Sequence, residues 1–303
     1  MPELPEVETI VRGLQQAVIG LKITDIWCQY PQTIKTHSIA NFTKALKGAE
    51  VLAARRRAKY ILLDLNNNQT IAIHQKMSGH LLYGKWHKQE QKVTTKTMGT
   101  DPGWIPLLQD LAYHDPYNRF IRFIIFLNNG QMLGLSDVRR FARIYLGKSD
   151  KLEQIHDFAK LGPEPLAVDF SFNNFQKCFK KRKGLLKKVL MDPYVIAGIG
   201  NIYADEILWY SGLHPLARVE KLSLDQLKKL HKYTRLVLTK AIAAKGHSEM
   251  NYRKLDGQKG EYQLIACAYQ RHGTACKKRD GGILQKLSIN NRSAHFCPVH
   301  QSL

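Results

Sequence analysis

Acidic residues are scarce in this chain: 25 Asp and Glu stand against 46 Lys and Arg among its 303 residues. The formal net charge is therefore +21 at pH 7. A surplus of this size predicts a polyanionic partner, because a high net charge draws molecules of the opposite charge. Nucleic acid is favoured over a membrane surface, since no basic amphipathic stretch is present.

Long hydrophobic runs and a cysteine framework are also missing. No apolar run approaches the ~20 residues that a membrane-spanning helix needs, and the N-terminus lacks the basic and apolar regions of a secretory signal. The five cysteines are odd in number and mostly isolated, which argues against a disulfide scaffold and for a reducing compartment. We therefore expect an intracellular protein that is not associated with a membrane.

The chain is long enough for two domains, and its first half is patterned for a helix followed by strands. Proline at the first helical position and apolar residues at 3.6-residue spacing predict a helix from about Pro5 to Gly20. Residues 22–146 favour β-structure, with hairpin turns at Asn66–Asn68 and Asn128–Gly130.

Beyond this β-rich region the pattern becomes helical. The segment at 161–166 contains glycine and two prolines and marks a linker, while residues 170–245 show helical spacing. The tail at 261–303 is short and mixed, and it contains three of the five cysteines. A polar stretch between Tyr83 and His114 is interpreted as an inserted loop.

Proline is the second residue, and its chemistry depends on that position. Removal of Met1 would make Pro2 an N-terminal secondary amine, and an α-amino group with a pKa of about 7.7–8.0 keeps a usable neutral fraction near pH 7. Such an amine can attack an aldehydic carbon and form an iminium, with Glu3 and Glu6 close enough in sequence to act as proton donors or electrostatic partners. The alternative is that Pro2 only precedes a helix.

Five motifs, met in order along the chain, resemble those of one known family. They are PELPEVET at Pro2–Thr9, RRAKY at Arg56–Tyr60, HQKMSG at His74–Gly79, DVRRF at Asp137–Phe141 and AGIGNIYADE at Ala197–Glu206. Together they resemble the formamidopyrimidine-DNA glycosylase and endonuclease VIII family, in its formamidopyrimidine branch.

The resemblance implies an α+β, multidomain fold. An N-terminal β-sandwich with a flanking helix is expected at residues 1–150, a helical domain with a helix–two-turns–helix motif at 151–260, and a zinc-finger-like β-hairpin at 261–303. It also implies a monomer that acts at the nucleoid on double-stranded DNA containing damaged bases or abasic sites, without an organic cofactor.

The activity implied is base-excision repair by a DNA glycosylase that is also an abasic-site lyase. Carried over by position, Pro2 is the nucleophile at C1′ of the damaged nucleotide, Glu3 is the general acid/base at the sugar, and Lys59 assists β,δ-elimination and binds phosphate. The nucleotide must be flipped from the stack for its C1′ to reach the amine. Residues 246–261 resemble the loop that closes over oxidised purines, so 8-oxoguanine and formamidopyrimidines are the expected lesions.

Three residues match the family's trio that fills the gap left by a flipped nucleotide. These are Met77, Arg139 and Phe141. An apolar wedge and an arginine donor to the orphaned base would stabilise the distorted duplex. Taken singly, Met77 and Phe141 would instead be read as core residues.

Phosphate contacts are expected from the second half of the chain. Asn201 lies between a Gly-rich turn and a helix, where backbone and side-chain donors can meet a phosphate. Lys187, within a basic cluster at 180–188, is the best candidate for a direct phosphate contact, and Arg292 matches a family arginine that reaches phosphates beside the lesion.

The tail departs from the family's zinc finger, which has the pattern Cys-x2-Cys, a hairpin, then Cys-x2-Cys. The matching donors are Cys276, Cys297 and His300. Arg279 occupies the second position, and arginine does not bind zinc. If Zn²⁺ is bound, the fourth ligand is expected to be His272 or Cys267; otherwise the hairpin is metal-free and held by its packing.

Three other functions stay open. An intact Pro2–Glu3 pair argues against a catalytically silent DNA-binding relative, and the lack of RNA-binding signatures argues against an RNA-binding protein. Lys76, where the family has glycine, and the insertion leave a preference for oxidised pyrimidines open.

Overall fold

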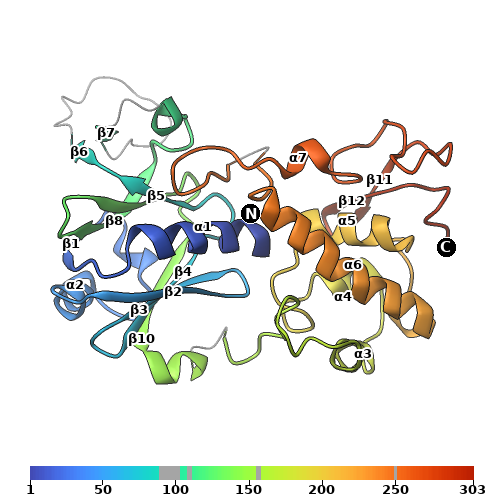
Figure 1. Ribbon diagram of the computed structural model, residues 1–303, viewed down its shortest axis with the longest axis horizontal. Helices are drawn as coiled ribbons and strands as arrows, with labels where there is room; N and C mark the ends of the chain where they lie inside the picture. Colours follow the sequence, from blue (N-terminus) through green and yellow to red (C-terminus); the bar gives the residue numbers. More distant parts are fainter. Residues whose placement is uncertain (89–102, 108–110, 155–157, 249–250) are drawn as a thin grey trace. The chain divides into compact units, whose positions relative to one another are not determined.

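The computed structural model describes residues 1–88, 103–107, 111–154, 158–248 and 251–303 (Figure 1). The chain divides into two compact units. Unit 1 consists of Met1–Pro2, Glu6–Ile155 and Lys245–Glu261, and unit 2 consists of Glu3–Pro5, His156–Ala244 and Tyr262–Leu303. Residues 246–261, for which the sequence predicts a lesion-covering loop, are therefore part of unit 1.

Unit 1 contains the expected β-sandwich, built from two four-stranded antiparallel sheets (Figure 1). The first sheet has the order β1 (Ile23–Cys28), β8 (Ile121–Leu127), β9 (Met132–Ser136) and β5 (His80–Gly84). The second has the order β10 (Arg143–Lys148), β4 (Gln69–His74), β3 (Tyr60–Leu65) and β2 (Val51–Arg57). One hydrophobic core joins apolar side chains of both sheets.

Two helices complete this core. The predicted opening helix is confirmed as α1 (Leu4–Ala17), whose Val7, Ile10 and Leu14 are fully buried at the expected spacing. Helix α2 (Ile39–Leu46) buries Phe42 and Leu46 in the same core. The short 3-10 helices η1 (Pro31–Thr33), η2 (Leu111–His114) and η3 (Ser149–Gln154) belong to this unit as well.

Both predicted hairpin turns are confirmed, since they join β3 to β4 and β8 to β9. The interpretation of residues 83–114 as a loop is wrong in part: β6 (Trp86–Lys88) pairs with β7 (Trp104–Pro106). Trp86 and Trp104 are buried against β5 and β8, and this burial of large apolar rings stabilises the pairing. Residues 89–102 and 108–110 of the insertion lie outside the described residues.

Unit 2 is helical up to its C-terminal hairpin, as the periodicity predicts (Figure 1). Its elements are α3 (Phe172–Phe179), α4 (Leu186–Leu190), α5 (Asn201–Ser211), η4 (Val219–Lys221), α6 (Leu224–Ala243), α7 (Tyr262–Ile265), β11 (Gln285–Ile289) and β12 (Arg292–Phe296). Helix α6 begins at a capping box in which Ser223 and Gln226 satisfy each other's backbone N–H groups. Across the described part of the chain, no helix is long and apolar enough to cross a membrane.

Candidate functional site

Glu3 is held at the start of helix α5. Its carboxylate is almost fully buried and accepts backbone N–H groups from Gly200 (2.8 Å), Ile202 (2.9 Å) and Tyr203 (3.3 Å). These donors belong to the N-cap and first turn of α5, where the helix dipole also favours a negative group. The orientation of this carboxylate is therefore set by the helix terminus.

The glycine-rich turn before α5 explains how Glu3 reaches that position. The Leu4 N–H donates to the Gly198 carbonyl (3.0 Å), and Gly198 has φ +87°. A Cβ at position 198 would lie 2.7 Å from the Leu4 side chain. Glycine is therefore required there, both for the backbone conformation and for the close approach of the N-terminal residues.

In unit 1, Glu6 connects helix α1 to the segment at 245–261. It is buried, and its Oε1 accepts the backbone N–H of His247 (2.8 Å) from the 245–261 segment. Pro2 is also buried, behind an exposed Met1. Burial, with the positive N-terminus as a second cause, lowers the pKa of His247 to about 4, so this imidazole is neutral near pH 7.

Cations gather around His74 in the same unit. Burial lowers the pKa of His74 well below its ordinary value, and Lys76, Lys59 and Arg143 lower it further by their charge. The His74 Nδ1 accepts the Lys76 N–H (3.0 Å), so the neutral ring carries its proton on Nε2. His74 is the first residue of the HQKMSG motif, and the sequence predicted no role for it. Lys59, which is expected to bind phosphate, is therefore one of three cations whose charges act on His74.

Hydrogen bonds tie together the two loops that carry Met77, Arg139 and Phe141. The Ser78 hydroxyl donates to the buried Asp137 (2.5 Å), and Asp137 accepts the backbone N–H of Ala142 (2.8 Å). Met77 is 44% exposed and Phe141 is 49% exposed, so neither is a core residue.

Arg139 stacks on this exposed surface, with its guanidinium 4.6 Å from the Phe141 ring centre. Met77 and Phe141 also line a pocket of about 380 Å³ that the Met1 side chain shares. Its basic lining residues are Lys35, Lys76, Arg140 and Arg143.

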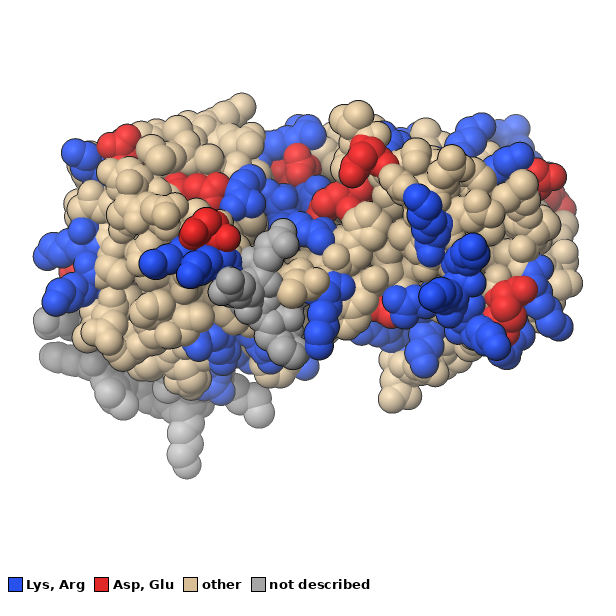
Figure 2. All heavy atoms as spheres, turned by 90° about the horizontal axis from the view of Figure 1, so that it is seen from below, with Lys and Arg blue, Asp and Glu red and all other residues tan. Residues whose placement is uncertain are grey.

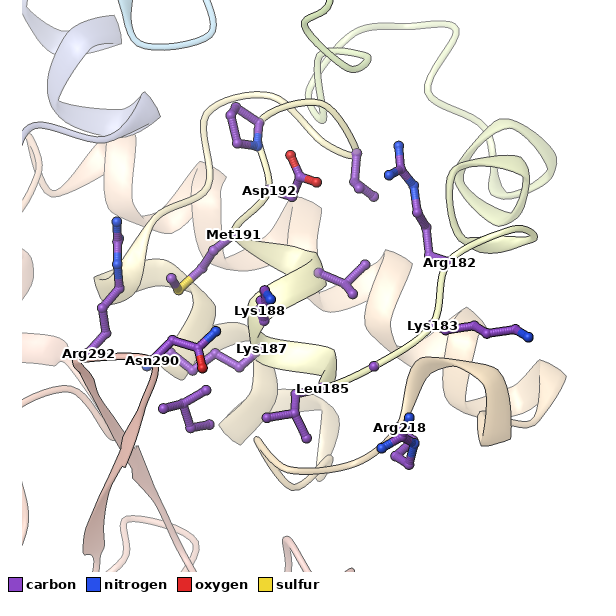
Figure 3. A pocket seen from close by; sticks show the side chains of 15 residues that line it. Arg182, Lys183, Leu185, Lys187, Lys188, Met191, Asp192, Arg218, Asn290 and Arg292 are labelled. Atoms are coloured by element: carbon purple, nitrogen blue, oxygen red, sulfur yellow. The ribbon is translucent and has the colours of Figure 1, made fainter.

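Unit 2 has a larger cationic pocket of about 640 Å³ between α4 and the β11–β12 hairpin (Figure 3). Its basic lining residues are Arg182, Lys183, Lys187, Lys188, Arg218 and Arg292. Lys and Arg side chains also predominate over acidic ones on the face drawn in Figure 2. Concentrated positive charge with few acidic neighbours suits a polyanionic backbone.

The three expected phosphate-binding residues meet at this hairpin but differ in exposure. Arg292 is exposed at the start of β12, and the Asn201 side-chain amide donates to the Ser293 hydroxyl (3.4 Å). Lys187 is only 1% exposed, and its Nζ lies 2.6 Å from Asp205 Oδ1 and donates to the Ser293 carbonyl (2.5 Å). Burial lowers the pKa of Lys187. The Lys187 amine is therefore bound by Asp205 and by the Ser293 carbonyl.

Four donors converge at the C-terminal hairpin. One ligand atom each from Cys276, Asp280, Cys297 and His300 lies within 4.8 Å of all the others. The three expected ligands are thus brought together. The fourth member is Asp280, which the sequence did not indicate. The family's spacing places this ligand at position 279, and the expected substitutes were His272 and Cys267. Two thiols, an imidazole and a carboxylate make a possible metal-binding group.

The two residues expected to supply the fourth ligand are not members of this donor group, although Cys267 packs in the same buried cluster as Cys276 and Cys297. The Cys267 Sγ is 3.6 Å from the Tyr210 hydroxyl, and its backbone N–H donates to Glu206 (2.9 Å). The His272 ring is 6.1 Å from the ring of His295. Neither belongs to the donor group within the described residues.

Comparisons with known proteins cover the whole chain. The formamidopyrimidine-DNA glycosylase N-terminal domain family matches residues 1–144, and the formamidopyrimidine-DNA glycosylase H2TH domain family matches residues 161–252. The chain is 32% identical to the formamidopyrimidine-DNA glycosylase of Herpetosiphon aurantiacus, over 100% of both chains, and 36% identical to that of Protochlamydia amoebophila, over 99% of each.

Solved structures agree with these relatives. The chain is similar to the Lactococcus lactis Fpg in complex with an abasic site containing DNA, with a TM-score of 0.83 and 28% identity over 99% of this chain and 100% of that one. It is equally similar, with a TM-score of 0.83, to a mutant of that protein in complex with a Fapy-dG containing DNA. The chain therefore belongs to the formamidopyrimidine-DNA glycosylase family.

Proposed function

We propose that this protein is a base-excision repair enzyme that removes oxidised purines, namely 8-oxoguanine and formamidopyrimidines, from double-stranded DNA. The observation that carries the proposal is the Pro2–Glu3 pair at the chain start, in which the Glu3 carboxylate is buried and held by three backbone N–H groups of the α5 terminus. Family membership and the abasic-site and Fapy-dG complexes of similar structures support it.

The chemistry assigned to Pro2 begins when Met1 is removed, because a chain that retains Met1 has no secondary amine. The Pro2 nitrogen forms a bond to C1′ while the bond to the damaged base breaks, and the base leaves with the electron pair and takes up a proton. The Glu3 carboxylate takes the proton from the Pro2 nitrogen and passes it to the sugar ring oxygen as the bond between C1′ and that oxygen breaks and the iminium forms. Lys59 then assists β- and δ-elimination, in which the 3′ and 5′ phosphates leave.

DNA contacts come from both units. The exposed Met77 and Phe141, with Arg139 stacked on Phe141, would enter the space of the flipped nucleotide. Arg292 would contact a phosphate directly, and Asn201 would do so from the first turn of α5.

For Lys187 we propose a supporting role. Its amine is already paired with Asp205 and bonded to the Ser293 carbonyl, so it holds the start of β12 beside Arg292.

A structural Zn²⁺ belongs to this proposal, with no organic cofactor. Cys276, Cys297 and His300 would hold it, and their convergence in the hairpin supports this assignment. A bound Zn²⁺ would supply no bond-breaking chemistry; it would fix the hairpin that carries Arg292. We also propose that the protein acts as a monomer at the cytoplasmic nucleoid, with domain limits at 1–150, 151–260 and 261–303.

Borohydride trapping tests the mechanism and ranks lesions together. Duplexes that carry 8-oxoguanine, a formamidopyrimidine, an oxidised pyrimidine or an abasic site are incubated with the protein and reduced. We expect an adduct whose peptide begins at residue 2, formed faster with the oxidised purines than with the oxidised pyrimidine. The abasic site needs no base release and serves as the positive control for trapping. A preparation that retains Met1 is the matched control and should trap nothing. Strand cleavage by that control would exclude the Pro2 mechanism, and a preference for the pyrimidine would exclude the lesion class.

A further inference from the structure

The C-terminal hairpin lacks one ligand at a family position. Arg279 stands there with an exposed side chain, and arginine keeps its proton and has no lone pair to offer. We propose that Asp280, the next residue, is the fourth ligand of a Cys2AspHis site for a divalent transition-metal ion such as Zn²⁺. This inference rests on the metal site proposed above and identifies the ligand that completes it.

The loop after Cys276 is shaped to place Asp280 among the donors. The Arg279 N–H donates to the Cys276 carbonyl (3.0 Å), and Arg279 has φ +57°, a left-handed conformation that turns the chain. The Gly282 N–H donates to Asp280 Oδ1 (3.0 Å). A Cβ at Gly282 would overlap the Cys297 Sγ, so glycine is what allows the loop to close over the cysteine.

The distances fit a tetrahedral site with two sulfur ligands. With bonds of about 2.3 Å to sulfur and about 2.0–2.1 Å to nitrogen or oxygen, the edges between sulfur and nitrogen or oxygen are about 3.6 Å long. Cys297 Sγ lies 3.5 and 3.6 Å from the two Asp280 oxygens, and Cys276 Sγ lies 3.7 Å from His300 Nδ1. One carboxylate oxygen would be the ligand, so one Asp280–Cys297 distance and the Cys276–His300 distance match two sulfur edges of such a tetrahedron.

The hydrogen bonds of His300 favour metal binding through Nδ1. Its Nε2 lies 3.2 Å from the Trp209 carbonyl, and only a protonated Nε2 can donate there. A neutral ring then turns the Nδ1 lone pair toward Asp280 Oδ2 at 2.5 Å. Two lone pairs at that distance need a positive centre. A shared proton fits the 2.5 Å separation, whereas a bound metal ion would draw the two atoms apart to about 3.3 Å. A ligating histidine whose second nitrogen donates to a backbone carbonyl is the usual arrangement in metal sites.

X-ray absorption at the zinc edge and Co²⁺ substitution test the ligand set on the full-length protein. We expect two sulfur scatterers at about 2.3 Å, two nitrogen or oxygen scatterers at about 2.0–2.1 Å and a single imidazole. Replacing Asp280 with Asn keeps its shape but removes its charge, and Asp280→Ala removes the ligand altogether. A change outside the ligands lowers zinc affinity by about 10–100-fold. Chelator competition should show a larger loss of zinc affinity in both Asp280 variants.

The control variants are the residues that could otherwise complete the site. Cys267→Ser and His272→Ala should leave zinc content, affinity and the Co²⁺ spectrum unchanged. The Asp280 assignment would be overturned, with the zinc site intact, if X-ray absorption showed three sulfur scatterers or two imidazoles. It would also be overturned if a control variant lost zinc and the Asp280 variants did not. Absence of zinc from the unmodified protein after loading would overturn both proposals.

Discussion

The ion pair between Lys187 and Asp205 gives a prediction whose size follows from the structure. Lys187→Met removes the cation beside an Asp205 that is 0% exposed. Loss of one partner of a buried pair costs about 3–5 kcal/mol, because the remaining charge stays buried. Asp205 keeps the Nδ1 and backbone N–H of His295 at 2.8 and 3.0 Å, so we expect a loss near the lower limit, about 3 kcal/mol of the free energy of unfolding.

Urea unfolding of the full-length protein, followed by tryptophan fluorescence, measures this loss. Lys187→Met combined with Asp205→Asn removes both charges and should recover most of the stability, since the amide oxygen still accepts from His295. Lys228→Ala is the matched control, because Lys228 is an exposed lysine on α6 whose ion pair with Asp225 is solvated. It should change the free energy of unfolding by less than about 0.5 kcal/mol.

The salt dependence of DNA binding separates this supporting role from a direct phosphate contact. A residue that neutralises one phosphate contributes about 0.9 to the slope of log K against log salt. We expect Lys187→Met to weaken binding at every salt concentration with little change in slope, because the start of β12 is no longer held. A slope reduced by a full unit with unchanged stability would refute this reasoning.

Three further predictions concern Arg292, His80 and Lys76. Arg292→Ala should reduce the salt slope by about 0.9 and leave the lesion ranking unchanged, as equilibrium binding to several lesion duplexes would show; a changed ranking would contradict a pure phosphate contact. Burial lowers the pKa of His80 to about 4, so the unfolded chain binds more protons than the folded protein between about pH 6.5 and 4. Stability should therefore fall as the pH falls through that range. His80→Gln should flatten the pH profile of the unfolding midpoint, and an unchanged profile would exclude His80 as the cause. Lys76 has φ +53°, so Lys76→Gly should raise stability by about 1 kcal/mol. It should also weaken DNA binding, because it removes one of the cations whose charges act on His74. Calorimetry that shows destabilisation would contradict the strain argument.

Local patterns in the sequence predicted the local structure well. The period of the apolar residues predicted α1, and the Asn- and Gly-containing turns predicted two hairpins of the sandwich, because these signals act between residues close in the chain. The motif strings identified the family and its candidate residues. Short-range signals failed in the insertion, where β6 pairs with β7 while Trp86 and Trp104 pack against the sheet that contains β5 and β8.

Only the tertiary structure decided what several candidate residues contact. The sequence predicts a direct phosphate contact for Lys187, yet its side chain is buried because Asp205 and Ser293 approach it from other elements. Asp280 has no special spacing to Cys276, and it meets His300 only because a left-handed Arg279 and a close-packed Gly282 turn the loop inward. Composition and periodicity describe neighbours along the chain, whereas these contacts join residues separated by about twenty positions or more. Their geometry depends on how the helices and the hairpin pack, and that is settled by the fold as a whole.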